Sequence, residues 1–212
     1  MGLSKPYLLL YNLVQAFGWG YILYLELLSS ARSGDVGYFL QIFQTLALLE
    51  VFHACFRLVR SSPLTTIIQL SSRIFVVWAV LYLYPEVKVH SKVFKMMVVS
   101  WCLAEITRYC YYFACLLFKP PFSLTYLRYS LFMILYPTGI LGELLLILLS
   151  LSYVSKRSPI DFPMPNRLNV ALHGYCVYWI VLIMYLPFSP VMYKHMLAQR
   201  RKVLGSPTRK NV

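Results

Sequence analysis

The sequence predicts an all-α membrane protein, a bundle of six transmembrane helices with both termini in the cytosol. Hydrophobic residues make up 59% of the 212 residues and charged residues only 13%, whereas about 25% charged residues is usual in a soluble domain. The apolar residues gather into six stretches, and each is long enough to cross a bilayer as a helix, which takes about 20 residues. None of them alternates polar with apolar residues as the strands of a membrane barrel do. We therefore predict that all six are helices.

The predicted helices cover residues 7–28, 38–60, 64–84, 94–117, 122–153 and 170–193. The first follows Lys5 directly and is too long and too aromatic for a cleaved secretory signal, so we predict an uncleaved anchor. The linkers are short, and the longest, residues 155–167, contains three prolines. We therefore predict one transmembrane domain, residues 1–198, followed by a polar, basic cytosolic tail, residues 199–212.

Lys and Arg residues indicate the orientation, because cytosolic loops carry an excess of them. Ten lie on the side of the two termini, at positions 5, 57, 60, 119, 194, 200, 201, 202, 209 and 210, and seven on the opposite side. The net charge of +13 would attract anionic lipid headgroups, the favoured interpretation, or a phosphate-bearing substrate such as coenzyme A. Nucleic acid is not expected as a partner of a chain that lies almost wholly in the membrane.

The cysteines predict neither a metal site nor a disulfide framework. All five lie within apolar stretches, with no C-x-x-C pair and no clustered histidines. Cys55 and Arg60 resemble the cysteine and arginine of a tyrosine-phosphatase loop, but only four residues separate them where such a loop has five. No metal or redox cofactor is predicted.

Several charged residues fall inside the predicted helices. They are Glu50, His53, Arg73, Glu105, Arg108 and Arg128. Glu105 and Arg108 are three residues apart, close enough to pair on a helix surface. Arg73 and Arg128 have no obvious local acid, so an anion could supply one. Polar groups of this kind either join helices to one another or mark a functional site.

The fifth predicted helix carries the most informative group of residues. Tyr136 and Glu143 are seven residues apart, which is almost two turns, so both lie on nearly one face and about 10 Å apart along the axis. Gly139 between them would let a ligand approach the backbone, and Pro137 is expected to kink the helix. Kinks and glycines are also common in ordinary membrane helices. The combination of carboxyl, phenol, glycine and proline within two turns nevertheless favours a site.

A carboxyl and a phenol on either side of a ligand suit paired proton transfer. One group can take a proton from carbon while the other donates a proton to a departing hydroxyl group, which is a dehydration. We favour Glu143 as the base and Tyr136 as the acid, because a deprotonated tyrosine is hard to maintain in hydrocarbon. The reverse assignment stays open.

The segment from Tyr126 to Phe132, followed by Tyr136-Pro137-x-Gly139-x-x-x-Glu143, resembles the signature of the 3-hydroxyacyl-CoA dehydratases of the fatty-acid elongation cycle. These are also called protein-tyrosine-phosphatase-like proteins. The stretches 72–78 and 101–109 are similar to the third and fourth helices of that family, and the resemblance covers essentially the whole chain.

The resemblance implies a multi-pass enzyme of the endoplasmic reticulum that converts a (3R)-3-hydroxyacyl-CoA to a trans-2-enoyl-CoA without a cofactor. It implies that Tyr136 and Glu143 are catalytic. It also implies supporting or substrate-binding roles for five further residues: Arg73, Glu105, Arg108, Arg128 and Gly139. The expected partners are the acyl-CoA substrate, membrane lipid and the condensing enzyme, ketoacyl reductase and enoyl reductase of the cycle.

Two alternatives remain open at this point. The chain could be a noncatalytic scaffold or regulator of the elongation complex with the same fold. It could also be a small transporter that uses its intramembrane acids and His53 as a proton path. The presence of both Tyr136 and Glu143 favours the enzyme over the scaffold, and the lack of an internal repeat weighs against the transporter.

Overall fold

The computed structural model describes residues 4–28, 33–59, 63–89, 91–157, 161 and 173–205. Every regular element in these ranges is helical. In chain order the elements are α1 (Ser4–Leu27), α2 (Ser33–Leu46), α3 (Leu49–Cys55), α4 (Pro63–Ile74), the π-helix η1 (Phe75–Tyr82), the 3₁₀-helix η2 (Pro85–Val89), α5 (Ser91–Leu117), α6 (Phe122–Ser130), α7 (Phe132–Val154) and α8 (Gly174–Leu204). The all-α prediction is confirmed for the described part of the chain.

The helices are those of a membrane protein. Five stretches are long and apolar enough to cross a bilayer: Lys5–Leu27, Asp35–Cys55, Pro63–Tyr82, Phe122–Val154 and Gly174–Leu204. Each overlaps one of the predicted helices. The remaining prediction, residues 94–117, corresponds to α5, which is not among these five and carries Glu105 and Arg108 within its length. Glu105 and Arg108 are accommodated by ion pairs with Arg73 of α4 and Glu50 of α3.

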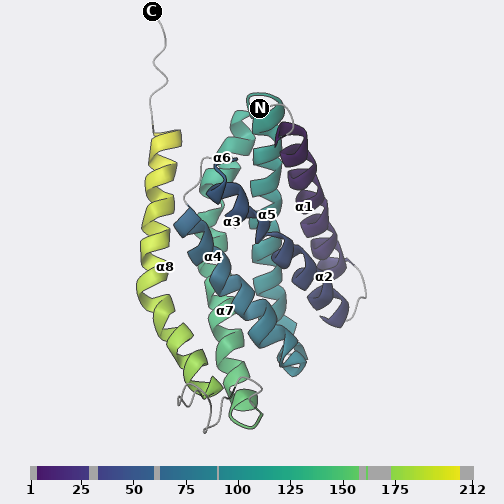
Figure 1. Cartoon of the computed structure of the whole chain (residues 1–212), viewed down its shortest axis with the longest axis vertical. Coiled ribbons are helices and arrows are strands. Elements are labelled where there is room, and N and C mark those ends of the chain that lie inside the picture. The colour runs from purple at the N-terminus through teal and green to yellow at the C-terminus, as the bar shows by residue number, and fades with distance from the viewer. Residues whose placement is uncertain are drawn as a thin grey trace, which may run out of the picture.

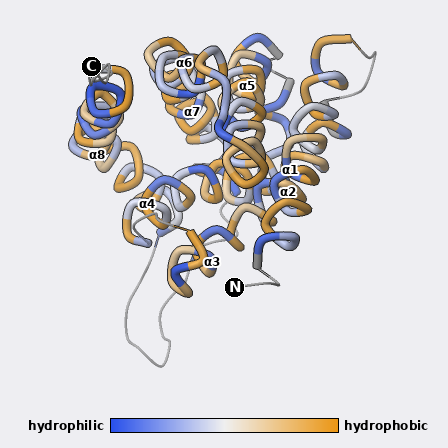
Figure 2. Tube along the Cα trace, turned by 90° about the horizontal axis from the view of Figure 1, so that it is seen from above, coloured by the Kyte–Doolittle hydropathy of each residue, from blue (hydrophilic) through white to orange (hydrophobic). Residues whose placement is uncertain are grey.

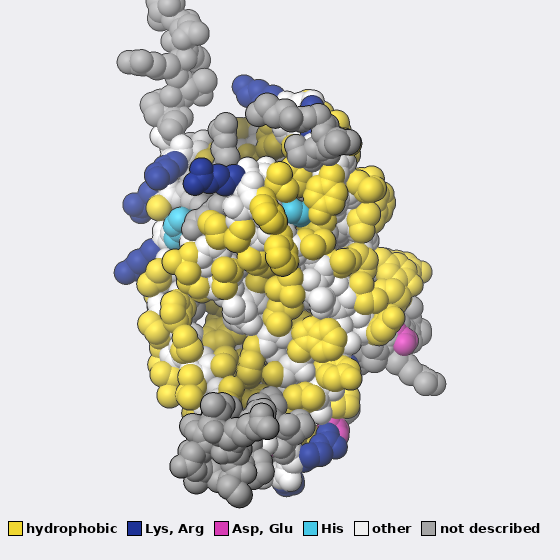
Figure 3. Space-filling model, viewed as in Figure 1, with side chains coloured by type: hydrophobic (Ala, Val, Ile, Leu, Met, Phe, Trp, Pro, Cys, Tyr) yellow, Lys and Arg dark blue, Asp and Glu magenta, His cyan; other side chains and the backbone are white. Residues whose placement is uncertain are grey.

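Helix α5 occupies the middle of the bundle, between α1 on one side and α7 on the other (Figures 1 and 2). Three large side chains of α5 are fully buried: Phe94, Trp101 and Tyr109. Elsewhere in the core, Trp19, Tyr84 and Tyr178 are also fully buried. Hydrophobic side chains also cover much of the face that Figure 3 shows, as expected for helices whose outer faces contact acyl chains. Helix α8 lies at one edge, against α7 and α6.

Two predicted helices are interrupted. The stretch 38–60 is divided between α2 and α3 at Ala47 and Leu48, and α3 ends at Cys55. The helix does not continue because Arg57 adopts the left-handed conformation, with a φ of 54°. The predicted helix ends at Arg60, which lies outside the described ranges. In the stretch 122–153 the interruption lies at Leu131, between α6 and α7.

Pro137 lies inside α7, which continues to Val154. Proline removes one backbone N–H from the helix and leaves the carbonyl of Met133 without its usual donor. One residue further along, the hydroxyl of Thr138 donates to the carbonyl of Ile134 at 2.9 Å. The element that carries Tyr136 and Glu143 is thus one helix, with no interruption between the two residues.

The beginning of α1 and the end of α8 lie at the same end of the bundle (Figure 1). Lys and Arg side chains gather there over α8 (Figure 3). Helix α8 extends to Leu204, so residues 199–204 of the predicted tail are helical, and residues 206–212 lie outside the described part of the chain.

Helices α5 and α7 pack tightly against each other at Gly142. A Cβ atom added there would lie 2.7 Å from Cβ and 3.1 Å from Cα of Met97. We expect Gly142→Ala to lower the free energy of unfolding by about 1–3 kcal/mol, because the two helices would have to separate. Gly20→Ala is the matched control, since nothing lies within 4 Å of the added atom. Thermal unfolding in detergent would test this, and equal melting temperatures for the two variants would contradict it.

Candidate active site

Tyr136 and Glu143 both reach from α7 to α8. The hydroxyl of Tyr136 donates to the backbone carbonyl of Ser189 at 3.1 Å, and its ring stacks on that of Tyr193 at a centroid distance of 5.9 Å. Glu143 receives a hydrogen bond from Tyr185, also on α8. The prediction that Tyr136 and Glu143 share one side of their helix is therefore confirmed.

The carboxyl group of Glu143 is enclosed and has a donor on each oxygen. Glu143 as a whole is only 5% exposed. Oε1 accepts a hydrogen bond from the indole Nε1 of Trp101 on α5, at 2.9 Å, and Oε2 accepts one from the hydroxyl of Tyr185, at 2.6 Å. Two donors from two helices fix the orientation of the carboxyl group and offset part of its desolvation cost.

The spacing along the two helices explains why these groups meet. Tyr185 and Ser189 are one turn apart on α8, and α8 runs antiparallel to α7 (Figure 1). Glu143 therefore lies beside Tyr185, and Tyr136 beside Ser189. Two prolines, at positions 187 and 190, lie inside α8 along this segment, where they remove two backbone N–H donors from the helix.

Gly139 faces α5 rather than an open space. An added Cβ would lie 3.6 Å from Cδ1 of Trp101, which is an ordinary contact distance. The glycine therefore packs beside the indole that binds Glu143. Close approach of a ligand to the backbone at Gly139 stays a prediction.

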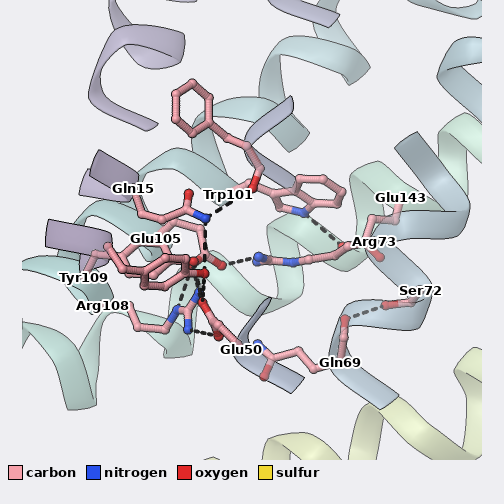
Figure 4. A network of polar contacts seen from close by, with 12 residues as sticks. Gln15, Glu50, Gln69, Ser72, Arg73, Trp101, Glu105, Arg108, Tyr109 and Glu143 are labelled. Atoms are coloured by element: carbon pink, nitrogen blue, oxygen red, sulfur yellow. Dashed lines mark hydrogen bonds and ion pairs between the residues drawn. The ribbon is translucent and has the colours of Figure 1, made fainter. Parts of the chain in front are cut away.

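Next to the site, four charged residues from three helices form a buried network (Figure 4). Arg108 on α5 binds both oxygens of Glu50 on α3, at 2.6 and 2.8 Å, and its Nε binds Glu105 at 2.7 Å. Arg73 on α4 pairs with the other oxygen of Glu105. The hydroxyl of Tyr109 also donates to Glu50, at 2.5 Å. Two carboxylates and two guanidinium groups balance, so the network has no net charge.

The prediction that Glu105 and Arg108 pair on α5 is confirmed. Arg73 has no acid close to it in the sequence, but helix packing brings Glu105 of α5 to it, so an anion is not needed as its partner. The guanidinium of Arg73 also lies over the ring of Trp101, at 4.8 Å from its centroid. Through this contact the network supports the indole that donates to Glu143.

Arg128 lies apart from this network, on α6. Its guanidinium lies 5.8 Å from the ring centroids of both Tyr112 and Tyr129. Among the described residues, Arg128 forms no ion pair with an acid. Lys194 and Arg201 lie about two turns apart on one face of α8, toward its C-terminal end. Both could attract an anion.

Trp101, Tyr185 and Ser189 were not predicted as site residues. One sequence signal could have indicated Tyr185: a proline, Pro187, follows it two positions later in an apolar helix. Tyr136 is likewise followed by a proline, Pro137. No local pattern identifies Trp101, since its role depends on how α5 packs against α7.

The chain resembles known proteins along nearly its whole length. The family model described as protein tyrosine phosphatase-like protein, PTPLA, matches residues 44–206. A relative from Caenorhabditis elegans, named very-long-chain (3R)-3-hydroxyacyl-CoA dehydratase hpo-8, is 39% identical over 97% of this chain and 98% of its own length. The dehydratase PASTICCINO 2 from Arabidopsis thaliana is 39% identical over 97% and 96%.

Human very-long-chain (3R)-3-hydroxyacyl-CoA dehydratase 2 is 36% identical over 96% of this chain and 82% of its own length. No solved structure gives a significant match. The match of the family model and the near full-length relatives establish that the chain belongs to the protein tyrosine phosphatase-like (PTPLA) family.

Proposed function

We propose that this protein removes water from a (3R)-3-hydroxyacyl-CoA to give a trans-2-enoyl-CoA, the third step of very-long-chain fatty-acid elongation. It is a hydro-lyase, as the names of its relatives indicate for those proteins. The observation that carries the proposal is the placement of Tyr136 and Glu143 two turns apart on α7 and both against α8. A carboxyl and a phenol held two turns apart on the same side of one helix can supply the two proton-transfer groups that the reaction needs.

In the proposed reaction the Glu143 carboxylate takes a proton from C2 of the substrate. The electron pair of that C–H bond forms the C2–C3 double bond, and the C3–O bond breaks. Tyr136 donates its phenolic proton to the departing hydroxyl group, which leaves as water. Transfer of the proton from Glu143 back to Tyr136 restores both groups, so no cofactor is consumed.

The structure supports Glu143 rather than Tyr136 as the base. Both carboxyl oxygens accept hydrogen bonds, which offset part of the cost of burying the ionised form. Tyr136 keeps its proton in a bond to a backbone carbonyl, so that a substrate hydroxyl could replace Ser189 as the acceptor.

A long ligand fits the depth of the site. Tyr136 lies 14 residues after the start of α6 at Phe122, about 20 Å along the axis at 1.5 Å per residue. We place the nucleotide of coenzyme A at the basic end of the bundle, near Arg128 and the face of α8 that carries Lys194 and Arg201. The acyl tail would extend among the helices. Because Glu143 is enclosed, neighbouring side chains have to move for the substrate to reach it.

We also propose a topology of six crossings in the endoplasmic reticulum membrane, with both termini cytosolic. Two features support it: the beginning of α1 and the end of α8 lie at one end of the bundle (Figure 1), which an even number of crossings requires, and Lys and Arg gather at that end (Figure 3). The condensing enzyme and the two reductases of the cycle are the proposed partners.

The purified protein should convert 3-hydroxyacyl-CoAs to enoyl-CoAs in detergent. Substrates of several chain lengths are offered, and the product is followed by mass spectrometry. A scaffold would give no turnover at any length, and a transporter would give none without a sealed membrane. A folded protein that leaves all substrates unchanged would contradict the proposed function.

A further inference from the structure

We propose that Tyr185 is a positioning residue of the dehydratase site, which orients the Glu143 carboxylate toward C2 of the substrate. This inference rests on the proposed function and adds a residue to it. Tyr185 does not act on the substrate itself in this account. It acts through the hydrogen bond that its hydroxyl donates to Oε2 of Glu143.

The contact is short and protected from lipid and water. The hydroxyl lies 2.6 Å from Oε2, and Tyr185 is 9% exposed. Trp101 holds the other oxygen at 2.9 Å from the opposite helix, α5. A carboxyl group can rotate about its terminal bond, so one donor alone leaves the direction of its free oxygen open. Two donors on different oxygens define the plane of the group.

The position of Tyr185 in α8 follows from the packing of that helix. The buried residues of α8 lie on one face: Gly174, Tyr178, Leu182 and Tyr185. Both tyrosines of this face donate to a fixed acceptor. Tyr178 donates to the backbone carbonyl of Ala79 in η1, which is a structural contact. Tyr185 is the one whose acceptor is a carboxylate with a proposed chemical role.

Loss of the Tyr185 hydroxyl should therefore affect chemistry more than folding. Tyr185→Phe keeps the ring that packs against α7 and leaves Oε2 of Glu143 without this donor. A hydrogen bond to a charged group is strong enough for its loss to lower kcat by about 10- to 100-fold. The substrate contacts are retained, so KM should stay within about twofold of the unaltered protein.

Tyr178→Phe is the matched control, because it removes a hydroxyl from a buried tyrosine on the same face of the same helix. Both variants are purified in detergent and assayed with one 3-hydroxyacyl-CoA, and their melting temperatures are measured. We expect a large loss of kcat in Tyr185→Phe alone, with a melting temperature no lower than that of Tyr178→Phe.

Three results would overturn the inference. The first is a kcat of Tyr185→Phe equal to that of Tyr178→Phe. The second is a loss that appears in KM with kcat unchanged. The third is a Tyr185→Phe protein that unfolds where Tyr178→Phe does not, because the hydroxyl would then have a structural role. Each leaves the proposed function intact as long as the unaltered protein dehydrates the substrate, whereas no turnover by that protein would reject both.

Discussion

Replacing Glu143 with glutamine should lower kcat for dehydration by about 10²–10⁴-fold, the usual contribution of a positioned proton-transfer group. Glutamine has nearly the same shape and its amide oxygen can still accept one of the two hydrogen bonds that Trp101 and Tyr185 donate. It cannot take a proton from C2. The substrate should therefore bind with a KM within a few-fold of normal, and the loss should lie in the chemical step.

Tyr136→Phe should cause a loss of similar size, because the departing hydroxyl group would no longer receive a proton. Tyr153→Phe is the matched control: Tyr153 is a partly buried tyrosine near the other end of α7 and packs against the core. Steady-state kinetics of the three variants in detergent would separate these cases. Near-normal kcat in Tyr136→Phe, or an equal loss in Tyr153→Phe, would contradict the assignment.

Replacing Arg108 with methionine should lower the free energy of unfolding by about 3–5 kcal/mol, the cost of leaving a buried charge without its partner. Arg108 binds both Glu50 and Glu105. When Arg108 is replaced, Glu105 still has Arg73 as a partner. Its removal changes the network from neutral to a net charge of −1 in an apolar bundle. Thermal or denaturant unfolding in detergent would measure the effect.

Two further variants test this explanation. Arg157→Met removes the other described ion pair, with Glu86, in which the side chains are 64% and 43% exposed. An exposed pair contributes about 0–1 kcal/mol, so this control should unfold almost normally. Adding Glu50→Gln to Arg108→Met leaves Arg73 with Glu105 and restores neutrality, so it should recover part of the stability. Equal effects of the buried and exposed substitutions would show that charge burial is not the cause.

The sequence was sufficient to predict the class of the fold because lipid imposes strong rules on composition. Long apolar stretches have to be helical, since backbone groups in hydrocarbon need internal hydrogen bonds. The break between α2 and α3 was not predictable in the same way. Ala47 and Leu48 include neither glycine nor proline, and the turn is instead tightened by short-range bonds such as Leu48 N–H to the carbonyl of Thr45 at 3.0 Å.

At the site, sequence could predict what depends on one helix and not what depends on packing between helices. The seven-residue spacing of Tyr136 and Glu143, and the three-residue spacing of Glu105 and Arg108, are properties of a single helix. The partners of Glu143 come from α5 and α8, 42 positions away in each direction. No spacing rule relates such distant residues, so Trp101 and Tyr185 became evident only in the folded bundle.

The most direct test of the account is the turnover of a double variant that combines Tyr136→Phe with Glu143→Gln. If the two groups act as a unit on one substrate, the double variant should be no more than a few-fold slower than the slower single variant, because groups that work together are strongly non-additive. Losses that multiply, or a single variant that turns over at the normal rate, would contradict the claim that Tyr136 and Glu143 jointly eliminate water.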